Sequence, residues 1–140
     1  MIRDTTATFT SQEKTDADLH TMLETRKGRF LVAQVGDDCV GFVTWGPFRN
    51  GDGYKHTAEH SIITGKCGRG IGRALILEAL KQAHAQGLHV MVAGIGSENA
   101  AAVAFHQKLG FAMSGRLSQV GHKNGRWHDL ILMSRITTTP

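Results

Sequence analysis

The sequence lacks any long apolar run, and its first residues do not show the pattern of a secretory signal. These absences argue against a membrane protein, and we expect a cytoplasmic protein with no membrane partner. Cysteine is scarce as well, because Cys39 and Cys67 are the only two and they do not have metal-ligand spacing. We therefore expect free thiols and no metal site.

Aromatic residues are also few, at 6% of the chain, and the basic residues are scattered although the net charge is +4. Nucleic-acid-binding surfaces combine clustered basic residues with aromatic side chains, so we expect no nucleic-acid partner. The positive charge suits a small anionic ligand instead. A length of 140 residues with 41% apolar and 20% charged residues predicts one globular domain, residues 1–140.

Glycine is concentrated in residues 65–73, where four glycines occur within eight positions. Residues 60–64 before this segment are typical of a strand, and residues 74–84 behind it are strong helix formers. A strand, a glycine-rich turn and a helix aim free backbone N–H groups and the positive end of the helix at one place. This arrangement predicts an anion site, best suited to a phosphate.

The rest of the chain alternates between strand and helix patterns, which predicts the α/β class with a mixed sheet. We expect strands at 5–10, 30–35, 39–45, 57–64, 88–95, 111–117 and 128–136, of which 57–64 is the one that leads into the glycine turn. Besides the helix behind that turn, we expect helices at 15–26 and 98–109. The strands at 30–35 and 39–45 form a hairpin, and a polar loop separates the last two strands.

Three phosphate-binding schemes compete for the glycine turn. A Walker A string does not occur, and the spacing Gly68-x-Gly70-x-Gly72 differs from the dinucleotide fingerprint Gly-x-Gly-x-x-Gly. Residues 70–75 resemble the pyrophosphate loop of the GCN5-related N-acetyltransferase (GNAT) superfamily. Judged from these residues alone, the alternative that the glycines only form a turn and bind no phosphate remains open.

A second segment, residues 99–111, resembles the other acetyl-CoA-binding segment of that superfamily. Asn99 would begin a helix near the cofactor, and His106 would face the thiol. Seven residues are two helical turns, so the two side chains would lie on one face. Taken alone, a histidine in a helix is more often an ordinary surface or core residue.

Four further segments narrow the resemblance to the phosphinothricin acetyltransferase family. They are residues 5–9, 46–49, 54–61 and 120–129. This resemblance implies the GNAT acyl-CoA N-acyltransferase fold, acetyl-CoA as cosubstrate, and acetylation of the α-amino group of L-phosphinothricin or methionine sulfoximine. Measured against this resemblance, we expect two departures from the family: an N-terminus shortened by about one strand and one helix, and Cys67 in a shortened approach to the pyrophosphate loop.

The resemblance also implies the residues that hold the cofactor. Backbone N–H groups of Ile62, Ile63 and Thr64 would bond the pantetheine arm. The pyrophosphate would be bound by Gly68, Arg69, Gly70, Ile71, Gly72 and Arg73. Asn99 and His106 would complete the cofactor site from the second segment.

For catalysis, the resemblance assigns two residues. Glu59 would remove the ammonium proton as general base, through water, and His106 would protonate or stabilise the leaving thiolate. The alternative for Glu59 is a solvated carboxylate at the start of a strand. The acceptor is expected to contact Arg49, Tyr54, Lys123 and His128, with Arg49 as the partner of an anionic group.

The sequence thus predicts an acetyl-CoA-dependent N-acetyltransferase that acts on a small amino acid by direct attack. A degenerate acyl-CoA-binding or sensing protein without transfer activity is the first alternative, and a dinucleotide-binding protein is the second. An open sheet edge near residues 5–10 would invite pairing, so we also expect a homodimer.

Overall fold

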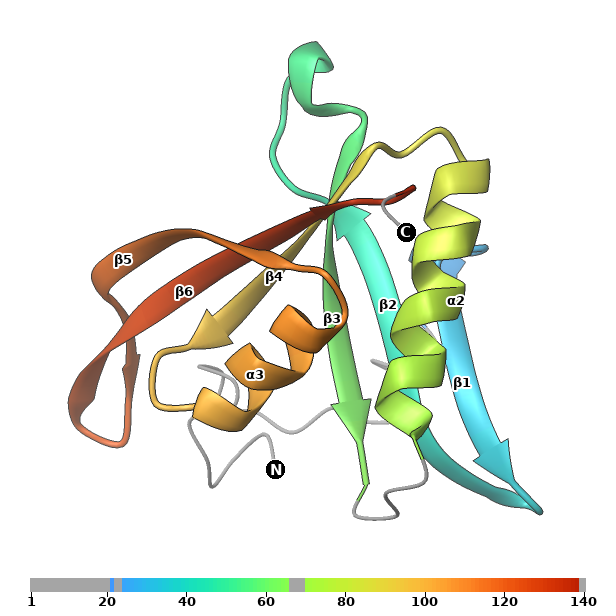
Figure 1. The fold of residues 1–140 in the computed structure, drawn as a ribbon, viewed down its shortest axis with the longest axis horizontal. Helices are drawn as coiled ribbons and strands as arrows, with labels where there is room; N and C mark the ends of the chain where they lie inside the picture. Colours follow the sequence, from blue (N-terminus) through green and yellow to red (C-terminus); the bar gives the residue numbers. More distant parts are fainter. Residues whose placement is uncertain (1–20, 22–23, 66–69, 139–140) are drawn as a thin grey trace.

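The computed structural model describes residues 21, 24–65 and 70–138 of the chain. Its centre is a six-stranded sheet in the order β1-β2-β3-β4-β6-β5 (Figure 1). The strands are β1 (Phe30–Val35), β2 (Asp38–Pro47), β3 (Thr57–Thr64), β4 (Val90–Gly96), β5 (Ala112–Lys123) and β6 (Arg126–Ile136). Strands β3 and β4 are parallel and every other neighbouring pair is antiparallel, so the mixed sheet expected from the sequence is confirmed.

The first hairpin is confirmed with a tight connection. Val35 pairs with Asp38 across Gly36 and Asp37. Gly36 has a φ of +60°, which glycine adopts without the steric cost that a Cβ would bring.

The prediction of a polar loop between the last two strands is wrong. Strands β5 and β6 stay paired up to Lys123 and Arg126, so the connection is only Asn124 and Gly125. Both residues have positive φ, at 56° and 73°, which is the geometry of a two-residue hairpin turn whose twist matches that of the strands. An irregularity between Leu117 and Gly121 absorbs the extra residues in β5.

Two helices cover one face of the sheet: α2 (Ile71–Ala85) and α3 (Ala100–Lys108). Each ends at a glycine in the left-handed region, Gly87 or Gly110. The next residue, Leu88 or Phe111, donates its N–H to the carbonyl five residues earlier and is itself buried. This C-terminal motif directs both apolar side chains back under their helices.

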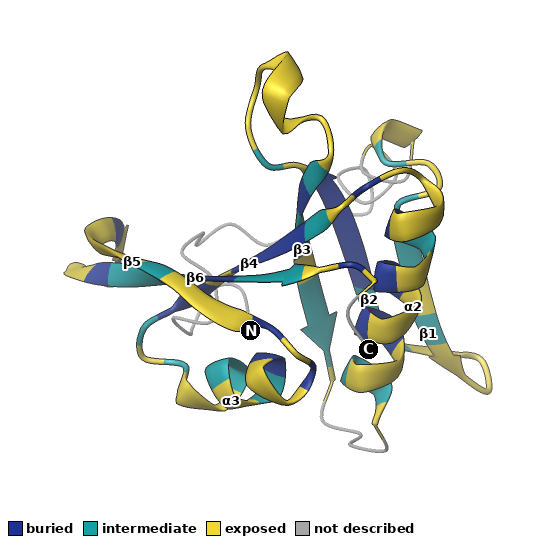
Figure 2. Ribbon diagram, turned by 45° about the horizontal axis from the view of Figure 1, so that its top comes forward, coloured by how far each residue is buried: buried dark blue, intermediate teal, exposed yellow. Residues whose placement is uncertain are grey.

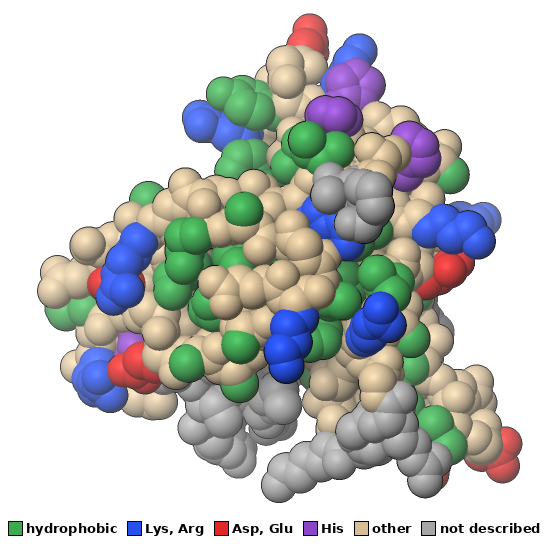
Figure 3. Space-filling model, in the orientation of Figure 1, with side chains coloured by type: hydrophobic (Ala, Val, Ile, Leu, Met, Phe, Trp, Pro, Cys, Tyr) green, Lys and Arg blue, Asp and Glu red, His purple; other side chains and the backbone are tan. Residues whose placement is uncertain are grey.

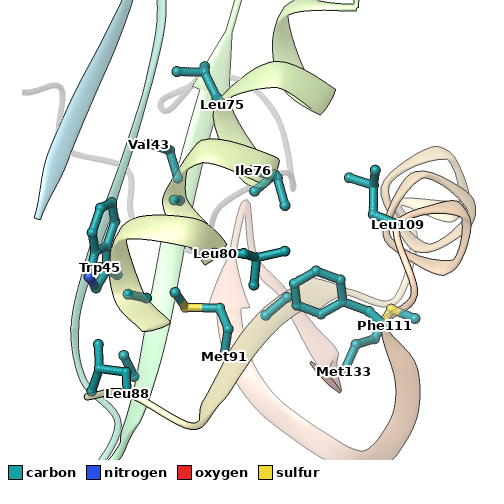
Figure 4. Packing of buried hydrophobic residues seen from close by; sticks show 14 of the residues in the cluster. Val43, Trp45, Leu75, Ile76, Leu80, Leu88, Met91, Leu109, Phe111 and Met133 are labelled. Atoms are coloured by element: carbon teal, nitrogen blue, oxygen red, sulfur yellow. The ribbon is translucent and has the colours of Figure 1, made fainter. Parts of the chain in front are cut away.

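The core lies between the sheet and these helices, and Figure 2 shows that buried residues are concentrated in the central strands and in parts of the helices. Alternate residues of each central strand enter this core, as the two-residue period of a strand requires. Figure 4 shows side chains from α2 meeting those of the strands and of Phe111. The cluster includes Val43, Trp45, Ala58, Leu75, Ile76, Leu80, Met91, Ala93, Phe111 and Met133.

Part of the expected secondary structure lies outside the described residues, namely the strand at 5–10 and most of the helix at 15–26. Residues 21, 24 and 25 are helical, and Gly28 follows with a φ of +80°. The loop expected after β2 contains one short 3-10 helix, η1 (Asp52–Tyr54). The other expected strands and helices are confirmed, with ends that differ by a few residues.

Candidate active site

Strands β3 and β4 diverge halfway along their length. Their parallel pairing runs from Thr57 with Val90 to His60 with Ala93 and then stops (Figure 1). Beyond it, residues 61–64 remain paired with β2 on their other edge. Their backbone groups that face β4 therefore have no partner in that strand and are available to amide groups of a ligand. This segment contains Ile62, Ile63 and Thr64, the residues predicted to bond a pantetheine arm.

The N-terminus of α2 lies at the same end of β3. Gly70 precedes the helix with a φ of +69°, and it has no side chain to cap the first-turn N–H groups of residues such as Ile71. Gly72 allows close packing of the two helices, since a Cβ there would lie 3.1 Å from the Phe105 ring of α3 and the ring would have to shift by a few tenths of an ångström. Arg73 is exposed in the first turn. The predicted residues Gly68 and Arg69 lie outside the described part of the chain.

Glu59 points to the face of the sheet opposite the helices. It is the neighbour of His60, which pairs with the core residue Trp45, so its side chain takes the other face. Its Oε2 atom lies 3.1 Å from the position that a Cβ on Gly94 would occupy. The carboxylate is half-buried, and this desolvation raises the pKa of Glu59 above its ordinary value of 4.5, while the Arg26 charge lowers it in part. A carboxylate with a raised pKa is suited to accept a proton.

Arg26 is a site residue that the sequence did not reveal. Its guanidinium group lies on the face that carries Glu59, 3.2 Å from the position of a Cβ on Gly46, and its Nη1 donates to Thr44 Oγ1 at 3.5 Å. Gly46 is the strand partner of Glu59, so glycine there leaves room for a cation beside the carboxylate. No local pattern links Arg26 to Glu59, which lies 33 positions later in the chain.

His106 is turned into the protein, where it is 3% exposed. Its Nδ1 lies 2.7 Å from the Ala102 carbonyl oxygen, and its Nε2 lies 3.1 Å from Nε2 of His60. The two rings are 11° from parallel with centroids 5.1 Å apart, so they meet edge to edge. Phe111 packs its ring edgewise against both. Both ring nitrogens of His106 are thus engaged inside the protein.

His60 is the second residue that the sequence analysis missed. It is 6% exposed, and within the described part of the chain its Nδ1 has no hydrogen-bond partner. Burial, with a smaller effect of His106, lowers the pKa of His60 to about 3; burial also lowers the pKa of His106, although its bond to Ala102 opposes this. Both rings are therefore neutral near pH 7. His60 lies at the last paired position before the strands diverge.

Asn99 caps α3. Its side-chain oxygen accepts a hydrogen bond from the Ala102 N–H at 3.1 Å, which satisfies one free donor of the first turn. The predicted cofactor contact of Asn99 would therefore add to a structural role. The same cap fixes the turn that contains the Ala102 carbonyl, the partner of His106.

Two of the predicted acceptor residues lie together on the connection between β2 and β3. The Arg49 guanidinium carbon is 5.0 Å from the centre of the Tyr54 ring, a cation–π contact at an exposed position. Strand β3 begins three residues after Tyr54, with Glu59 close to its start. These two side chains are placed near the end of the sheet that carries Glu59.

Lys123 and His128 lie elsewhere, at the far end of the β5–β6 hairpin (Figure 1). His128 is 3% exposed; its Nε2 donates to the Lys123 carbonyl at 3.1 Å, and its Nδ1 lies 3.9 Å from Glu98 Oε1. Lys123 is 2% exposed. Figures 1 and 2 place this hairpin end and the β2–β3 connection at different ends of the molecule, so the four predicted acceptor residues are not brought together.

On the face drawn in Figure 3, Lys and Arg side chains are spread over several elements rather than gathered on one. Among the described residues, no three His, Cys, Asp or Glu side chains are grouped as a metal ion would require. Within the same ranges, neither helix has the length and apolar character needed to cross a bilayer.

Comparison with known proteins identifies the family to which this fold belongs. The family model described as "Acetyltransferase (GNAT) family" matches residues 1–111. The chain belongs to this family. The resemblance noted from the glycine turn and the second segment is thereby confirmed, and so is the GNAT fold.

Several individual members of the GNAT family are similar to this chain. An L-methionine sulfoximine/L-methionine sulfone acetyltransferase of Pseudomonas aeruginosa is 41% identical over 105 residues, which are 74% of this chain and 61% of the relative. A phosphinothricin N-acetyltransferase of Streptomyces viridochromogenes is 32% identical over 133 residues, 92% of this chain and 73% of the relative. A putative acetyltransferase of Salmonella typhimurium, solved with its cofactor acetyl-CoA, has a TM-score of 0.91 and 33% identity over 99% of this chain and 83% of its own. This GNAT chain therefore spans about three fifths of the length of the methionine sulfoximine acetyltransferase that it matches.

Proposed function

We propose that this protein transfers an acetyl group from acetyl-CoA to the α-amino group of a small amino acid such as methionine sulfoximine or L-phosphinothricin. The observation that carries the proposal is the divergence of β3 from β4 beside the N-terminus of α2, with the half-buried Glu59 across the sheet. The names of the relatives supply the acceptor class.

Acetyl-CoA supplies the activated acetyl group. Its pyrophosphate would be held by first-turn N–H groups of α2, at Gly70, Ile71, Gly72 and Arg73 together with Gly68 and Arg69. Backbone groups of Ile62, Ile63 and Thr64 would bond the amides of its arm, because their side toward β4 has no strand partner. Asn99 would contribute from the start of α3.

Glu59 is the proposed general base. An amino acid arrives as an ammonium ion and must lose a proton before its nitrogen can attack the acetyl carbon. Glu59 accepts this proton through water, and its raised pKa makes it a stronger base than an exposed glutamate. The Arg26 charge acts in the opposite direction on the pKa of Glu59 and favours the ionised carboxylate, which is the form that can accept a proton.

The sulfur must receive a proton when the carbon–sulfur bond breaks. The ammonium nitrogen loses two protons in the whole reaction. Glu59 takes one of them and passes it to solvent, and the second is equivalent to the proton that the departing sulfur gains as it becomes a thiol. His106 is proposed to act at this end of the site. Because both of its ring nitrogens are engaged, His106 acts by positioning His60, and the proton reaches the sulfur from solvent rather than from either neutral ring.

For the acceptor, we propose Arg49 as the partner of its anionic group, with Tyr54 orienting the guanidinium. Lys123 and His128 are the other two residues that the resemblance implies. Both side chains are buried at the far end of the hairpin, away from Arg49 and Tyr54, so no contact with the acceptor is assigned to them in this proposal.

Association of two copies is a further proposal. Strand β5 lies at one end of the sheet order, and the hairpin it forms with β6 exposes Met113, Leu117, Val120 and Trp127. Apolar side chains of this size favour burial against another surface. Light scattering at micromolar concentration should give the mass of a dimer; the mass of a monomer would contradict this proposal.

A thiol-release assay tests the proposed activity. Acetyl-CoA is supplied with methionine sulfoximine, L-phosphinothricin or a polyamine, side by side. Turnover with the first two and not with the polyamine supports the proposal. CoA binding without turnover on any acceptor would favour an acyl-CoA-binding or sensing protein instead.

A further inference from the structure

The hydrogen bonds around His106 fix which nitrogen of each buried ring carries a proton. The Ala102 carbonyl can only accept, so His106 Nδ1 must be the protonated nitrogen that donates to it at 2.7 Å. In a neutral ring the other nitrogen, Nε2, is then bare and must accept. The donor of the 3.1 Å bond between the rings is therefore His60 Nε2–H.

This assignment leaves His60 Nδ1 as a bare acceptor. The ring is 6% exposed, and within the described ranges this nitrogen has no hydrogen-bond partner. A buried acceptor without a donor is unfavourable, so the site is incomplete as it stands. Burial lowers the pKa of His60 to about 3, and the ring is therefore not a proton donor near neutral pH.

The position of His60 indicates which donor completes the site. The N-terminus of α2, where the pyrophosphate is proposed to bind, follows the Thr64 end of β3. His60 lies at the opposite end of the unpaired segment, at the point where β3 and β4 separate. A ligand arm laid along residues 61–64 from the phosphate end would bring its terminal group to His60, and that terminal group is a thiol in free CoA.

We propose that His60 Nδ1 accepts a hydrogen bond from the thiol of CoA, with His106 as the positioning residue that sets the His60 tautomer. The proposal rests on the proposed function. Acetyl-CoA has no S–H group, so this contact forms only after transfer and favours the released product over the substrate. Phe111 holds both rings edgewise, and its own N–H bonds the His106 carbonyl, so the pair is fixed on the helix side of the sheet.

Calorimetry with two ligands tests this contact without activity. CoA and desulfo-CoA, which lacks the sulfur, are titrated into the unchanged protein and into His60→Gln and His60→Asn. The Gln amide reaches the position of Nε2 and keeps a partner for His106, whereas the Asn amide reaches the position of Nδ1. We expect the unchanged protein to bind CoA roughly threefold to tenfold more tightly than desulfo-CoA. This ratio should be largely lost in His60→Gln and retained in His60→Asn.

Loss of the ratio in both variants would still support His60 as the thiol contact. Equal ratios in all three proteins would overturn the proposal, and so would an equal weakening of both ligands in His60→Gln, which indicates an amide of the arm as the donor. If CoA does not bind to the unchanged protein at all, the proposed function fails together with this inference. CoA binding with unchanged ratios removes the inference alone.

The tautomers are tested separately by nitrogen NMR of histidine-labelled protein without ligand. We expect a protonated Nε2 and a bare Nδ1 for His60, and the reverse for His106. Addition of CoA should shift the His60 Nδ1 signal, whereas desulfo-CoA should shift it less. A protonated His60 Nδ1 in the free protein would refute the assignment.

Discussion

Gly94 offers a direct test of the Glu59 role. A methyl group at this position would meet Glu59 Oε2 at 3.1 Å and Leu130 Cδ1 at 3.6 Å, where ordinary contacts begin at 3.4 Å. The backbone of Gly94 does not have a positive φ, so alanine fits the strand conformation. In Gly94→Ala the carboxylate, as the free end of a side chain, has to move by a few tenths of an ångström.

The expected size of the effect follows from this displacement. A misplacement of about 1 Å can lower catalysis roughly a hundredfold, so a shift of a few tenths should lower kcat/KM about threefold to tenfold. Stability should change in the other direction, because alanine restricts the unfolded chain and adds about 0.4–1 kcal/mol to the free energy of unfolding. Thiol release and denaturant unfolding measure the two quantities on the same sample.

A matched control separates the effect of the contact with Glu59 from the general effect of replacing a strand glycine by alanine. Gly115 is also a strand glycine, and no atom lies within 4 Å of its Cβ position, so Gly115→Ala should gain similar stability and keep full activity. In a Glu59→Gln background, Gly94→Ala should have little further effect on turnover, since the charged group it displaces is gone. A loss that persists in that background, or an equal loss in Gly115→Ala, would refute the reasoning.

Three further outcomes are expected. Glu59→Gln should lower kcat about a hundredfold or more in the thiol-release assay. The same substitution should change the dependence of stability on pH. Because the pKa of Glu59 is raised in the folded protein, the protonated side chain stabilises the fold below its ordinary pKa of 4.5, and this stabilisation is lost as the pH rises through the raised value. Circular dichroism should therefore give a higher melting temperature for Glu59→Gln than for the parent protein at pH 7, and this difference should disappear in acid. A difference in melting temperature that is the same at both pH values would contradict the burial of Glu59. Asn99→Ala removes the acceptor of the Ala102 N–H and should lower the free energy of unfolding by about 1 kcal/mol without ligand, whereas Asn99→Ser should recover most of it. Arg49→Ala should raise KM for an acidic acceptor about tenfold and leave KM for acetyl-CoA unchanged, with Arg49→Lys between them; equal changes in both KM values would remove Arg49 from the acceptor site.

The local elements could be predicted because their signals are local. Helix α2 has an apolar period behind a glycine turn, and β4 is a nearly continuous apolar run that the structure buries on both sides at Met91, Val92 and Ala93. The loop expected between the last strands was wrong although Asn124-Gly125 is a strong hairpin signal. The polar residues Gly, His, Lys and Arg around this dipeptide are typical of a loop, and only the pairing of β5 with β6 shows that they belong to the strands.

Site residues could be predicted from the sequence only where they lie in segments that resemble those of a known family. Glu59 and His106 lie in such segments, but the direction in which His106 points depends on His60, 46 positions earlier in the chain. The proximity of Arg26 to Glu59 likewise comes from tertiary structure, and the glycine at position 46 that permits it looks like an ordinary loop glycine in the sequence. Contacts of this kind require the register of the sheet, which the residue pattern does not specify.

The anchoring of α3 has a consequence for motion. Of its nine residues only His106 is buried, whereas α2 buries five side chains. A helix with so little buried surface opens locally at a lower free energy than the sheet beneath it, so its amide hydrogens should exchange with solvent sooner than those of α2. Each opening would separate His106 from His60 and uncover the inner end of the site, and the exchange rate of α3 would then report how tightly that end is closed.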